Sequence, residues 1–337
     1  MSKKYSTAVV IGRFQPIHNA HLDLINHAFS IAEKVIVILG SSHKPRTYKD
    51  PFTEYERMRM IQLATNSDDI EIRYVRDFLY NDAFWASNVQ RIVSEYDTVD
   101  QRICIVGHKK DDSSFYLDMF PQWTFEEFGL HTELHATDIR DLIFRDKPNF
   151  DYLANVVPRS TLEFLKGFAV SHEFREVLAE RKFDAEYKQQ YASLKYPPIF
   201  VTSDAVVVQS GHILLVERKA VPGKGLWALP GGYVNAMTDK SVQSAMIREL
   251  REETKIKVPA PVLIGSIVKS KVFDAIGRSS RGRIITHAFH IALNGSELPQ
   301  VKGGDDAKSA KWIPLSKLRS ENMFEDHYEI IRDLVGV

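Results

Sequence analysis

Short apolar runs alternate with longer amphipathic stretches from the start of the chain to about residue 145. Four short runs have the length and β-branched content of buried strands: Tyr5–Ile11, Lys34–Leu39, Ile70–Val75 and Arg102–Val106. Three stretches between them repeat apolar residues at helical spacing: His21–Ala32, Thr53–Ala64 and Ala83–Glu95. Strands that alternate with helices are typical of βαβ units, so we expect an α/β fold with a doubly wound parallel sheet, Rossmann-like in type.

The segments that follow the predicted strands indicate where a ligand would bind. Thr53 and Glu56 have the spacing of a capping box, which supports a helix that begins there. A doubly wound sheet binds its ligands beyond the carboxyl ends of the strands. We therefore expect the site among the segments that begin at Gly12, Gly40, Asp77 and Gly107.

The pattern changes after a polar stretch, Ala179–Lys195, which is followed by Tyr196-Pro197-Pro198. Because proline does not continue a helix, we place a domain boundary inside this stretch and expect domains of residues 1–187 and 188–337. The second half reads as strands at Ile199–Gln209, His212–Glu217, Val262–Lys271 and Ile284–Leu293, with helices at Ser241–Thr254 and from Ser316 onward. This mixture predicts a second domain of α+β type.

Charge and cysteine content narrow the classes of partner. Lys plus Arg and Asp plus Glu each number 44, so no basic excess exists for a nucleic-acid backbone, and we expect no nucleic acid. Cys104 is the single cysteine, which excludes an intramolecular disulfide and fits a reducing, cytoplasmic compartment. The apolar run Ala8–Ile11 is too short for a signal core or a membrane span, so we expect no membrane partner. A homo-oligomer is compatible with the sequence.

Two histidines follow the first predicted strand. His18 and His21 are three residues apart, which puts both on one side of a first helical turn, where free N–H groups favour an anion. The guanidinium of Arg13 adds several donors, as phosphoryl oxygens require. The alternative is a surface turn with two unrelated histidines.

The segment Gly12–His21 resembles the H-x-G-H signature of the nucleotidyltransferase superfamily and, more narrowly, the archaeal-type nicotinamide mononucleotide (NMN) adenylyltransferases. It departs at Ala20, where glycine is usual. Arg46–Thr53, together with Glu56 and Arg57, resembles the stretch after the second strand in that family, and Thr137–Arg140 resembles its S/T-x-x-R phosphate motif.

This resemblance implies a reaction in which the phosphate of NMN attacks the α-phosphorus of ATP and expels pyrophosphate, with Mg²⁺ (or Mn²⁺) as the cation. Catalysis would consist of placement and charge neutralisation. The implied catalytic residues are His18, His21, Arg13 and Arg140. The implied residues around ATP and its phosphates are Gly12, Phe14, Arg46, Gly107, Asp111 and Thr137.

The stretch Asn81-Asp82-Ala83-Phe84-Trp85 is where the resemblance puts the second substrate. The face of Trp85 can stack on a flat, positively charged pyridinium ring, with Asn81 or Asp82 at the carboxamide. Core packing is the alternative role for Trp85. A transferase with another acceptor, such as phosphopantetheine or a flavin nucleotide, is the rival substrate assignment.

In the second half, three glutamates on one predicted helix suggest a metal site. Glu249, Glu252 and Glu253 fall within about 100° of arc that also contains the apolar Val242. Carboxylates at the edge of a buried face repel each other unless cations compensate, and Mg²⁺ or Mn²⁺ suits oxygen ligands. Arg248 is placed to orient them.

These residues resemble the R-E-x-x-E-E core of the Nudix box, and the resemblance to Nudix hydrolases covers about residues 200–315. The sequence departs from that box in three places: the spacing from Gly232 to Arg248 is two residues longer, Lys240 takes the first glutamate position and Lys255 takes the late glycine. The resemblance implies hydrolysis of a nucleoside diphosphate linked to another group by metal-activated water.

Gly225–Pro230 and Asp305-Asp306-Ala307 resemble the corresponding stretches of ADP-ribose pyrophosphatases and of Nudix-type regulators of NAD metabolism. ADP-ribose and water would then give AMP and ribose 5-phosphate. Arg248 and Glu249 are the implied catalytic residues, and Glu249, Glu252 and Glu253 the implied metal ligands. The general base is left open among Asp305, Asp306 and Glu249.

The whole chain resembles the bifunctional NMN adenylyltransferase/ADP-ribose pyrophosphatase family, which makes NAD in one half and clears ADP-ribose in the other. Lys240 motivates an alternative in which the Nudix half is a non-catalytic sensor of ADP-ribose or NAD. A nucleic-acid regulator with a Nudix domain is disfavoured by the zero net charge.

Overall fold

The computed structural model describes residues 3–337 except 68, 97–101, 110–111, 130–134 and 146. The chain divides into two compact units, Met1–Leu178 and Ala179–Val337. The division falls inside helix α7 (His172–Gln189), and the boundary proposed from the sequence at 187–188 lies near the end of the same helix. Each unit has its own sheet and core.

The first unit contains a parallel five-stranded sheet, as the alternation of strands and helices predicts. Its strands are β1 (Tyr5–Gly12), β2 (Ala32–Leu39), β3 (Ile70–Tyr74), β4 (Ile103–Gly107) and β5 (Thr124–Glu127), in the order β3-β2-β1-β4-β5. Strand β5 is not among the predicted strands because its four residues are only partly buried and show no apolar run.

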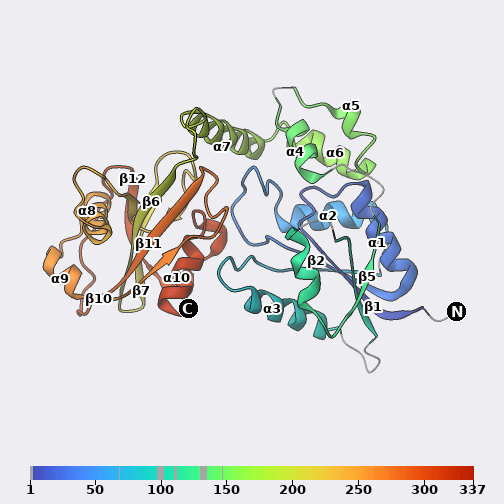
Figure 1. Ribbon diagram of the computed structural model, residues 1–337, viewed down its shortest axis with the longest axis horizontal. Coiled ribbons are helices and arrows are strands. Elements are labelled where there is room, and N and C mark those ends of the chain that lie inside the picture. The colour runs from blue at the N-terminus through green and yellow to red at the C-terminus, as the bar shows by residue number, and fades with distance from the viewer. Residues whose placement is uncertain (1–2, 68, 97–101, 110–111, 130–134, 146) are drawn as a thin grey trace. The chain divides into compact units, whose positions relative to one another are not determined.

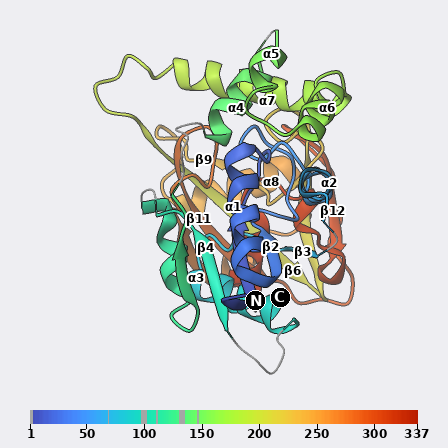
Figure 2. The same ribbon diagram turned by 90° about the vertical axis from the view of Figure 1, so that its right-hand side faces the viewer.

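Helices cover both faces of this sheet, which makes it doubly wound (Figure 1). On one face, Val10 and Val37 belong to a core that also includes residues of α1 (Asn19–Ile31), α2 (Glu54–Thr65), α4 (Ala136–Ile143), α5 (Phe150–Leu153) and α6 (Arg159–Phe168). On the other face, Val9 and Ile36 pack with α3 (Asp82–Ser94) and the 3₁₀ helix Asp112–Met119. Figure 2 shows α1 in front of the strands.

The start of α2 is confirmed, and α4 begins one residue before Thr137. Thr53 and Glu56 form the predicted capping box of α2, with the Thr53 N–H donating to Glu56 over 2.8 Å. In α4 the residue that precedes the first turn is His135, whose N–H donates to the Asp138 carboxylate over 2.9 Å. Thr137 therefore lies inside the first turn and does not cap the helix.

The second unit contains a mixed sheet, as expected for its α+β pattern. Strands β6 (Ile199–Gln209) and β11 (Arg283–Ala292) are parallel to each other, and the other pairs are antiparallel. The main order is β10-β11-β6-β7-β12, in which β8 pairs with β7 and β9 with β6. The remaining strands are β7 (His212–Arg218), β8 (Trp227–Ala228), β9 (Gly231–Tyr233), β10 (Ile267–Phe273) and β12 (Ala307–Pro314).

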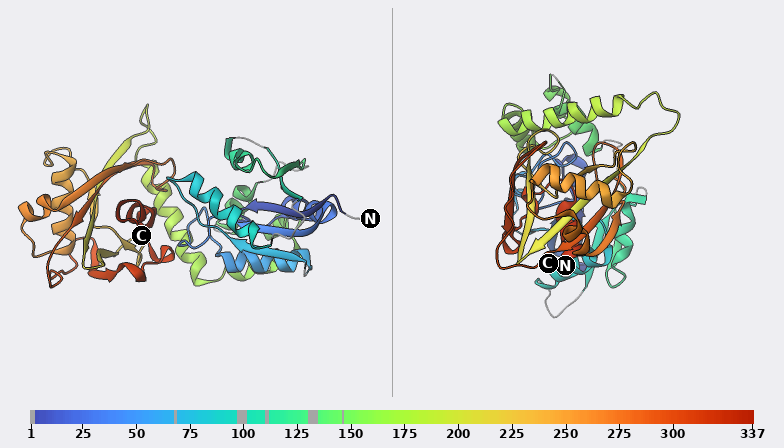
Figure 3. Two further views of the ribbon diagram at one scale, coloured as in Figure 1. Left: turned by 90° about the horizontal axis from the view of Figure 1, so that it is seen from below. Right: turned by 90° about the vertical axis from the view of Figure 1, so that its left-hand side faces the viewer.

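Two helices cover opposite faces of this sheet (Figures 1 and 3). Met246 and Leu250 of α8 (Val242–Thr254) pack into a core with apolar residues of β6, β7, β11 and β12. On the other face, α10 (His327–Val335) contacts β10 and β11 and buries Ile331. The sheet is thus a layer between helices.

Two sequence predictions for this unit are wrong in part. Val262–Lys271 is not one strand, because its first residues belong to α9 (Ala260–Gly265), and β10 starts at Ile267. Pro259 and Pro261 favour a helix start there, since their fixed φ suits a first turn. The C-terminal helix begins at His327, after short 3₁₀ turns at Leu315–Lys317 and Ser320–Asn322.

No helix in the described part of the chain is both long and apolar enough to span a bilayer.

Candidate functional sites

The carboxyl ends of β1 and β4 mark the switch point of the first sheet. Strand β1 pairs with β2 on one side and with β4 on the other, so the chain winds outward in both directions from this pair. Gly12 ends β1, and its carbonyl accepts a hydrogen bond from the N–H of Gly40, after β2, over 3.0 Å. Open α/β sheets bind ligands in the crevice at such a point.

The structure brings His18 and His21 together at this point. Their ring centroids are 3.7 Å apart with an interplanar angle of 24°, and Phe14 lies against His21 at 4.8 Å. His18 has an extended backbone and precedes the first residue of α1, while His21 lies in the first turn. Gln15 anchors the loop between β1 and α1, since its amide group exchanges hydrogen bonds of 2.8 and 2.9 Å with the backbone of Phe52.

Burial keeps both histidines neutral at neutral pH. It lowers the pKa of His18 from 6.5 to about 4, and burial together with the neighbouring His18 lowers the pKa of His21 well below its usual value. The Nδ1 atom of His21 is buried and has no hydrogen-bond partner among the described residues. A neutral imidazole still offers one N–H donor, so the pair can hydrogen-bond phosphate oxygens without carrying charge.

Arg140 is held against the loop that carries the histidines. It donates to the Gln15 carbonyl over 2.8 Å and to the Thr137 hydroxyl over 3.0 Å, while its buried Nε has no partner within the described residues. Arg13 is more exposed, with 43% of its side chain accessible, and its Nη1 lies 3.7 Å from an oxygen of Asp50. Of the two predicted phosphate-binding arginines, Arg140 is thus held by hydrogen bonds to the protein, whereas Arg13 is not.

Arg57 is a buried residue that fixes the end of the first two strands. Its guanidinium donates to the carbonyls of Arg13, Gly40 and Ser41 over 2.6, 2.7 and 3.2 Å, and to the Ser42 hydroxyl over 3.1 Å. In the sequence, Arg57 is noticeable only through the family resemblance, because a charged residue on an amphipathic helix ordinarily lies on the solvated face. Its role in holding backbone carbonyls is visible only in the fold.

Arg46, which the resemblance puts among the phosphate ligands, is already committed to protein acceptors. It donates to both oxygens of Glu56 over 2.5 and 2.8 Å and to the Pro51 carbonyl over 2.7 Å. This bidentate pair ties the loop after β2 to the first turn of α2. In this arrangement Arg46 positions the loop.

The predicted nicotinamide residues lie at the start of α3. Asn81 caps this helix, since its side-chain oxygen accepts a hydrogen bond from the Phe84 N–H over 2.9 Å, and Asp82 is exposed in the first turn. Trp85 is half-buried, with its ring 6.1 Å from that of Tyr116 and 6.0 Å from that of Phe120. One part of Trp85 therefore packs on the core and another part is accessible.

Two glycines at the strand ends sit in tight surroundings. A Cβ atom on Gly12 would lie 2.9 Å from the ring of Phe14, and one on Gly107 would lie 2.7 Å from the side chain of Leu117. The backbone therefore reaches close to neighbouring side chains where the ligand is expected. Asp111, the remaining predicted residue near adenosine, lies outside the described residues.

In the second unit, the Gly231-Gly232 segment of β9 lies directly against two glutamates of α8. Glu253 accepts a hydrogen bond from the Gly231 N–H over 3.0 Å, and a Cβ atom on Gly232 would lie 2.6 Å from an oxygen of Glu249. Burial raises the pKa of Glu253 to about 8 and also raises the pKa of Glu249. Two poorly hydrated carboxylates therefore lie behind this glycine pair.

Arg248 links the glutamates to a carboxylate that the sequence analysis did not identify. Its Nη1 donates to Glu249 over 2.8 Å and to Glu252 over 3.0 Å, and its other nitrogens donate to Asp239 over 3.0 and 2.7 Å. These bonds lower the pKa of Asp239 to about 2. Asp239 directly precedes Lys240, so the carboxylate partner of Arg248 is present one residue before the position where the Nudix pattern places a glutamate.

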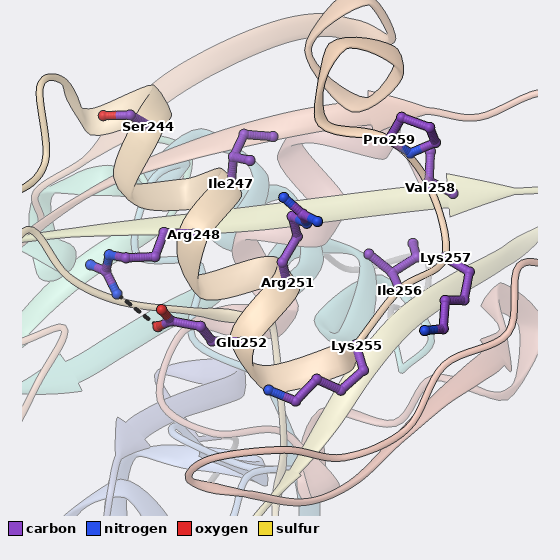
Figure 4. Close-up of a pocket in the computed structure, with 10 residues that line it drawn as sticks. All are labelled: Ser244, Ile247, Arg248, Arg251, Glu252, Lys255, Ile256, Lys257, Val258 and Pro259. Atoms are coloured by element: carbon purple, nitrogen blue, oxygen red, sulfur yellow. Dashed lines mark hydrogen bonds and ion pairs between the residues drawn. The ribbon is translucent and has the colours of Figure 1, made fainter.

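Glu252 borders a groove on the surface of the second unit. This groove of about 920 Å³ runs between α8 and residues 255–259, and Glu252 faces Arg248 at its edge (Figure 4). Lys255, which takes the late glycine position of the box, ends α8 with a φ of +48°, the left-handed conformation that glycine adopts most easily.

The donor chemistry of α8 fits a hard divalent cation. No three His, Cys, Asp or Glu side chains within the described residues are gathered closely enough to hold a metal as they stand. The partly buried carboxylates of Glu249 and Glu253 nevertheless carry raised pKa values, the result expected of oxygen donors that lack a compensating cation. These residues, with Glu252 after release from Arg248, fit Mg²⁺ or Mn²⁺.

The two aspartates considered as the general base, Asp305 and Asp306, have different surroundings. The loop that carries them is fixed to α8 by a 2.9 Å hydrogen bond from the Gly304 N–H to the Glu253 carbonyl. Asp305 is exposed, has a φ of +51°, and is close enough for its charge to contribute to the raised pKa of Glu249. Asp306 uses its carbonyl to accept from the Lys219 N–H over 3.2 Å. Asp305 is therefore the aspartate for which the structure records an interaction with the glutamates.

Comparison with known families finds two overlapping matches along the chain. Residues 9–250 match the cytidylyltransferase-like family and residues 200–334 match the NUDIX domain. A nicotinamide/nicotinic acid mononucleotide adenylyltransferase of Acinetobacter baylyi is 34% identical over 186 residues, which are 54% of this chain and 96% of that protein. An ADP-ribose pyrophosphatase of Methanocaldococcus jannaschii is 34% identical over 145 residues, 43% of this chain and 77% of that protein.

Solved structures from Francisella tularensis are similar over nearly the whole chain. A bifunctional NMN adenylyltransferase/ADP ribose pyrophosphatase has a TM-score of 0.91 and 35% identity, with 98% of this chain and 99% of that chain covered. A second structure, in complex with AMP and a Mn ion, gives a TM-score of 0.90 and 34% identity over the same shares. The chain belongs to the family of bifunctional NMN adenylyltransferases/ADP-ribose pyrophosphatases.

Proposed function

We propose that the first unit transfers AMP from ATP to NMN, giving NAD and pyrophosphate, and that the second unit hydrolyses ADP-ribose to AMP and ribose 5-phosphate. For the first reaction the supporting observation is the stacked pair His18–His21 at the switch point of the sheet. For the second it is the pair of partly buried carboxylates, Glu249 and Glu253, that lie against the glycines of β9.

In the first unit the residues act by placing two phosphates in line. The neutral rings of His18 and His21 donate hydrogen bonds to the oxygens of the transferring phosphate, where negative charge develops as the NMN phosphate attacks. Arg140, held by Gln15 and Thr137, binds the β- and γ-phosphates together with Arg13. Gly12 and Phe14 line the ATP site, and the accessible face of Trp85 stacks on the nicotinamide.

In the second unit the residues hold the diphosphate next to a nucleophilic water. Glu249, Glu252 and Glu253 would hold the cation, Arg248 orients Glu249, and Asp305 accepts the proton of the water. A divalent cation bound there lowers the pKa of its water and neutralises phosphate charge, and Mg²⁺ that accompanies ATP does the latter in the first unit.

The second proposed reaction has a direct test. Wild-type protein with Mg²⁺ or Mn²⁺ is expected to release AMP from ADP-ribose, and Glu253→Gln is expected to reduce this release by at least a hundredfold. ADP-ribose bound tightly by the wild type without turnover would instead support the sensor alternative. The position of Asp239 weakens the reason for that alternative, because Arg248 has its carboxylate partner despite Lys240.

The acceptor of the first reaction is tested by competition. NMN, its acid form, phosphopantetheine and a flavin mononucleotide are supplied with ATP, and the adenylylated products are separated and quantified. Trp85→Ala is expected to raise the KM for NMN at least tenfold with little change in the KM for ATP. Preference for phosphopantetheine or the flavin nucleotide would overturn the assignment of Trp85.

A further inference from the structure

Several cationic side chains of the first unit surround one buried carboxylate. Asp50, in the loop after β2, is 3% exposed. Lys44 forms an ion pair with it at 2.7 Å, and Arg13, after β1, approaches it to 3.7 Å. Lys49 directly precedes Asp50 in the chain, and its pKa is lowered by burial and by the charge of Arg13. The cations lie in the loops that follow β1 and β2, and the loop after β1 also leads to the histidine pair.

The surroundings hold Lys44 firmly. Besides Asp50, its ammonium group contacts Asp77 at 3.4 Å, and Asp77 accepts a further hydrogen bond from the Ser41 hydroxyl over 3.0 Å. Asp50 itself is fixed by the turn in which its N–H donates to the Thr47 hydroxyl over 3.1 Å. Lys44 is therefore bracketed by carboxylates from the loops after β2 and β3.

Arg13, by contrast, is attracted to Asp50 without being bonded to it. A separation of 3.7 Å is too long for a hydrogen bond, and the guanidinium of Arg13 donates none within the described part of the chain. The facing oxygen of Asp50 is buried and has no hydrogen-bond donor among those residues. All donors of Arg13 thus stay available to a ligand while the carboxylate charge keeps the side chain in place.

Asp50 is unsuited to contact a polyphosphate itself. It is buried and has the same sign of charge as the phosphates, which it would repel. Without its charge, however, Arg13, Lys44 and Lys49 would repel one another in a partly buried place, and Arg13 would lose the group that keeps it near the site. The Asp50 carboxylate therefore favours substrate binding indirectly, because it keeps its cationic neighbours together near the site.

We infer that Asp50 is a positioning residue of the adenylyltransferase site, which keeps Lys44 and Arg13 directed at the triphosphate of ATP. This inference rests on the proposed adenylyl transfer. It adds Lys44 to the phosphate-binding cations and gives the loop after β2 a role in ATP binding that Arg46, bound to Glu56, does not fill.

The test compares Asp50→Asn, which keeps the size and removes the charge, with Asp50→Glu, which keeps the charge. In the full-length chain, Asp50→Asn is expected to raise the KM for ATP at least tenfold while the KM for NMN changes less than threefold. Asp50→Glu is expected to recover at least part of the loss. Asp151→Asn, an exposed aspartate of α5, is the matched control and is expected to behave as wild type.

A double-mutant cycle with Lys44→Met separates positioning from a general structural effect. If Asp50 acts through Lys44, the combined variant raises the KM for ATP by less than the product of the two single effects. The inference would be overturned if the combined variant raised the KM for ATP by the full product of the two single effects. It would also be overturned if Asp50→Asn lowered the thermal midpoint without changing the KM for ATP. If Asp50→Asn does not fold, Asp50→Ser, which also removes the charge, replaces it in the cycle with the same criteria. A wild-type chain that forms no NAD would instead contradict the proposed function.

Discussion

At the scale of single residues, surroundings decide which of the predicted groups are available for chemistry. The spacing of three correctly indicates that His18 and His21 lie together, although His18 precedes α1 with an extended backbone and only His21 lies in its first turn. The sequence does not show that burial leaves both rings neutral. It also does not distinguish Arg140, which points its guanidinium at the histidine loop, from Arg46, which is bound to Glu56.

Arg140 provides a test of this distinction. Its planar guanidinium donates to Gln15 and Thr137 through two different nitrogens, whereas a lysine has a single nitrogen that cannot reproduce the spacing of these two donors. Arg140→Lys is expected to lower kcat/KM for ATP by about tenfold or more, whereas Arg159→Lys, at an exposed position of α6, is expected to leave it unchanged. NAD formation at varied ATP concentration measures both, and an unaffected Arg140→Lys variant would contradict the assigned role.

The lowered pKa of His18 predicts how stability depends on pH. The unfolded chain binds a proton at this residue near pH 6.5, whereas the folded chain resists protonation until about pH 4. The contribution of neutral His18 to the free energy of unfolding is therefore fully present above pH 6.5 and is lost as the pH falls towards 4. Protection of the β1 amides in hydrogen exchange, corrected for intrinsic rates, is expected to decrease over this range. The decrease should be smaller in His18→Asn, and an identical pH dependence in the two proteins would refute this explanation.

At the scale of elements, periodicity predicts most of the strongly apolar elements and misses short or polar ones, among them the strand β12 and the polar helix α7. The helices α1, α2, α3 and α8 and the strands β1, β2, β3 and β4 follow from apolar spacing. The strands β8 and β9 have two and three residues, too few for a period, although β9 supplies the glycines against Glu249 and Glu253. Asp239 was missed for a related reason. The loop between Asp239 and α8 brings it to Arg248, and no helical spacing indicates this contact.

The end of α8 gives a test at this scale. Lys255 has a left-handed backbone, which costs a residue with a Cβ atom about 1–2 kcal/mol, whereas glycine adopts it without that strain. Lys255→Gly is expected to raise the free energy of unfolding of the second unit by about 0.5–1 kcal/mol after the entropy cost of glycine. Lys257→Gly, at a neighbouring residue without positive φ, is the control and is expected to give no gain in chemical denaturation. Equal effects at both positions would show that backbone strain at Lys255 is not relieved.

At the scale of the whole molecule, the chain combines two phosphate sites of opposite construction. The first gathers neutral imidazoles and cationic side chains at the ends of parallel strands, and the second gathers carboxylates on one helix of a mixed sheet. Sequence motifs were sufficient to identify both units because each motif lies within a short segment. The contacts that Arg57 and Asp239 make were found only in the structure, since each residue joins segments that are separate in the sequence.

The most direct measurement follows both reactions in three full-length proteins: wild type, His21→Asn and Glu253→Gln. A crossed result is expected, in which His21→Asn loses at least a hundredfold in NAD formation and retains ADP-ribose hydrolysis, while Glu253→Gln does the reverse. Loss of both activities in either folded variant, or retention of both, would contradict two independent sites in one chain.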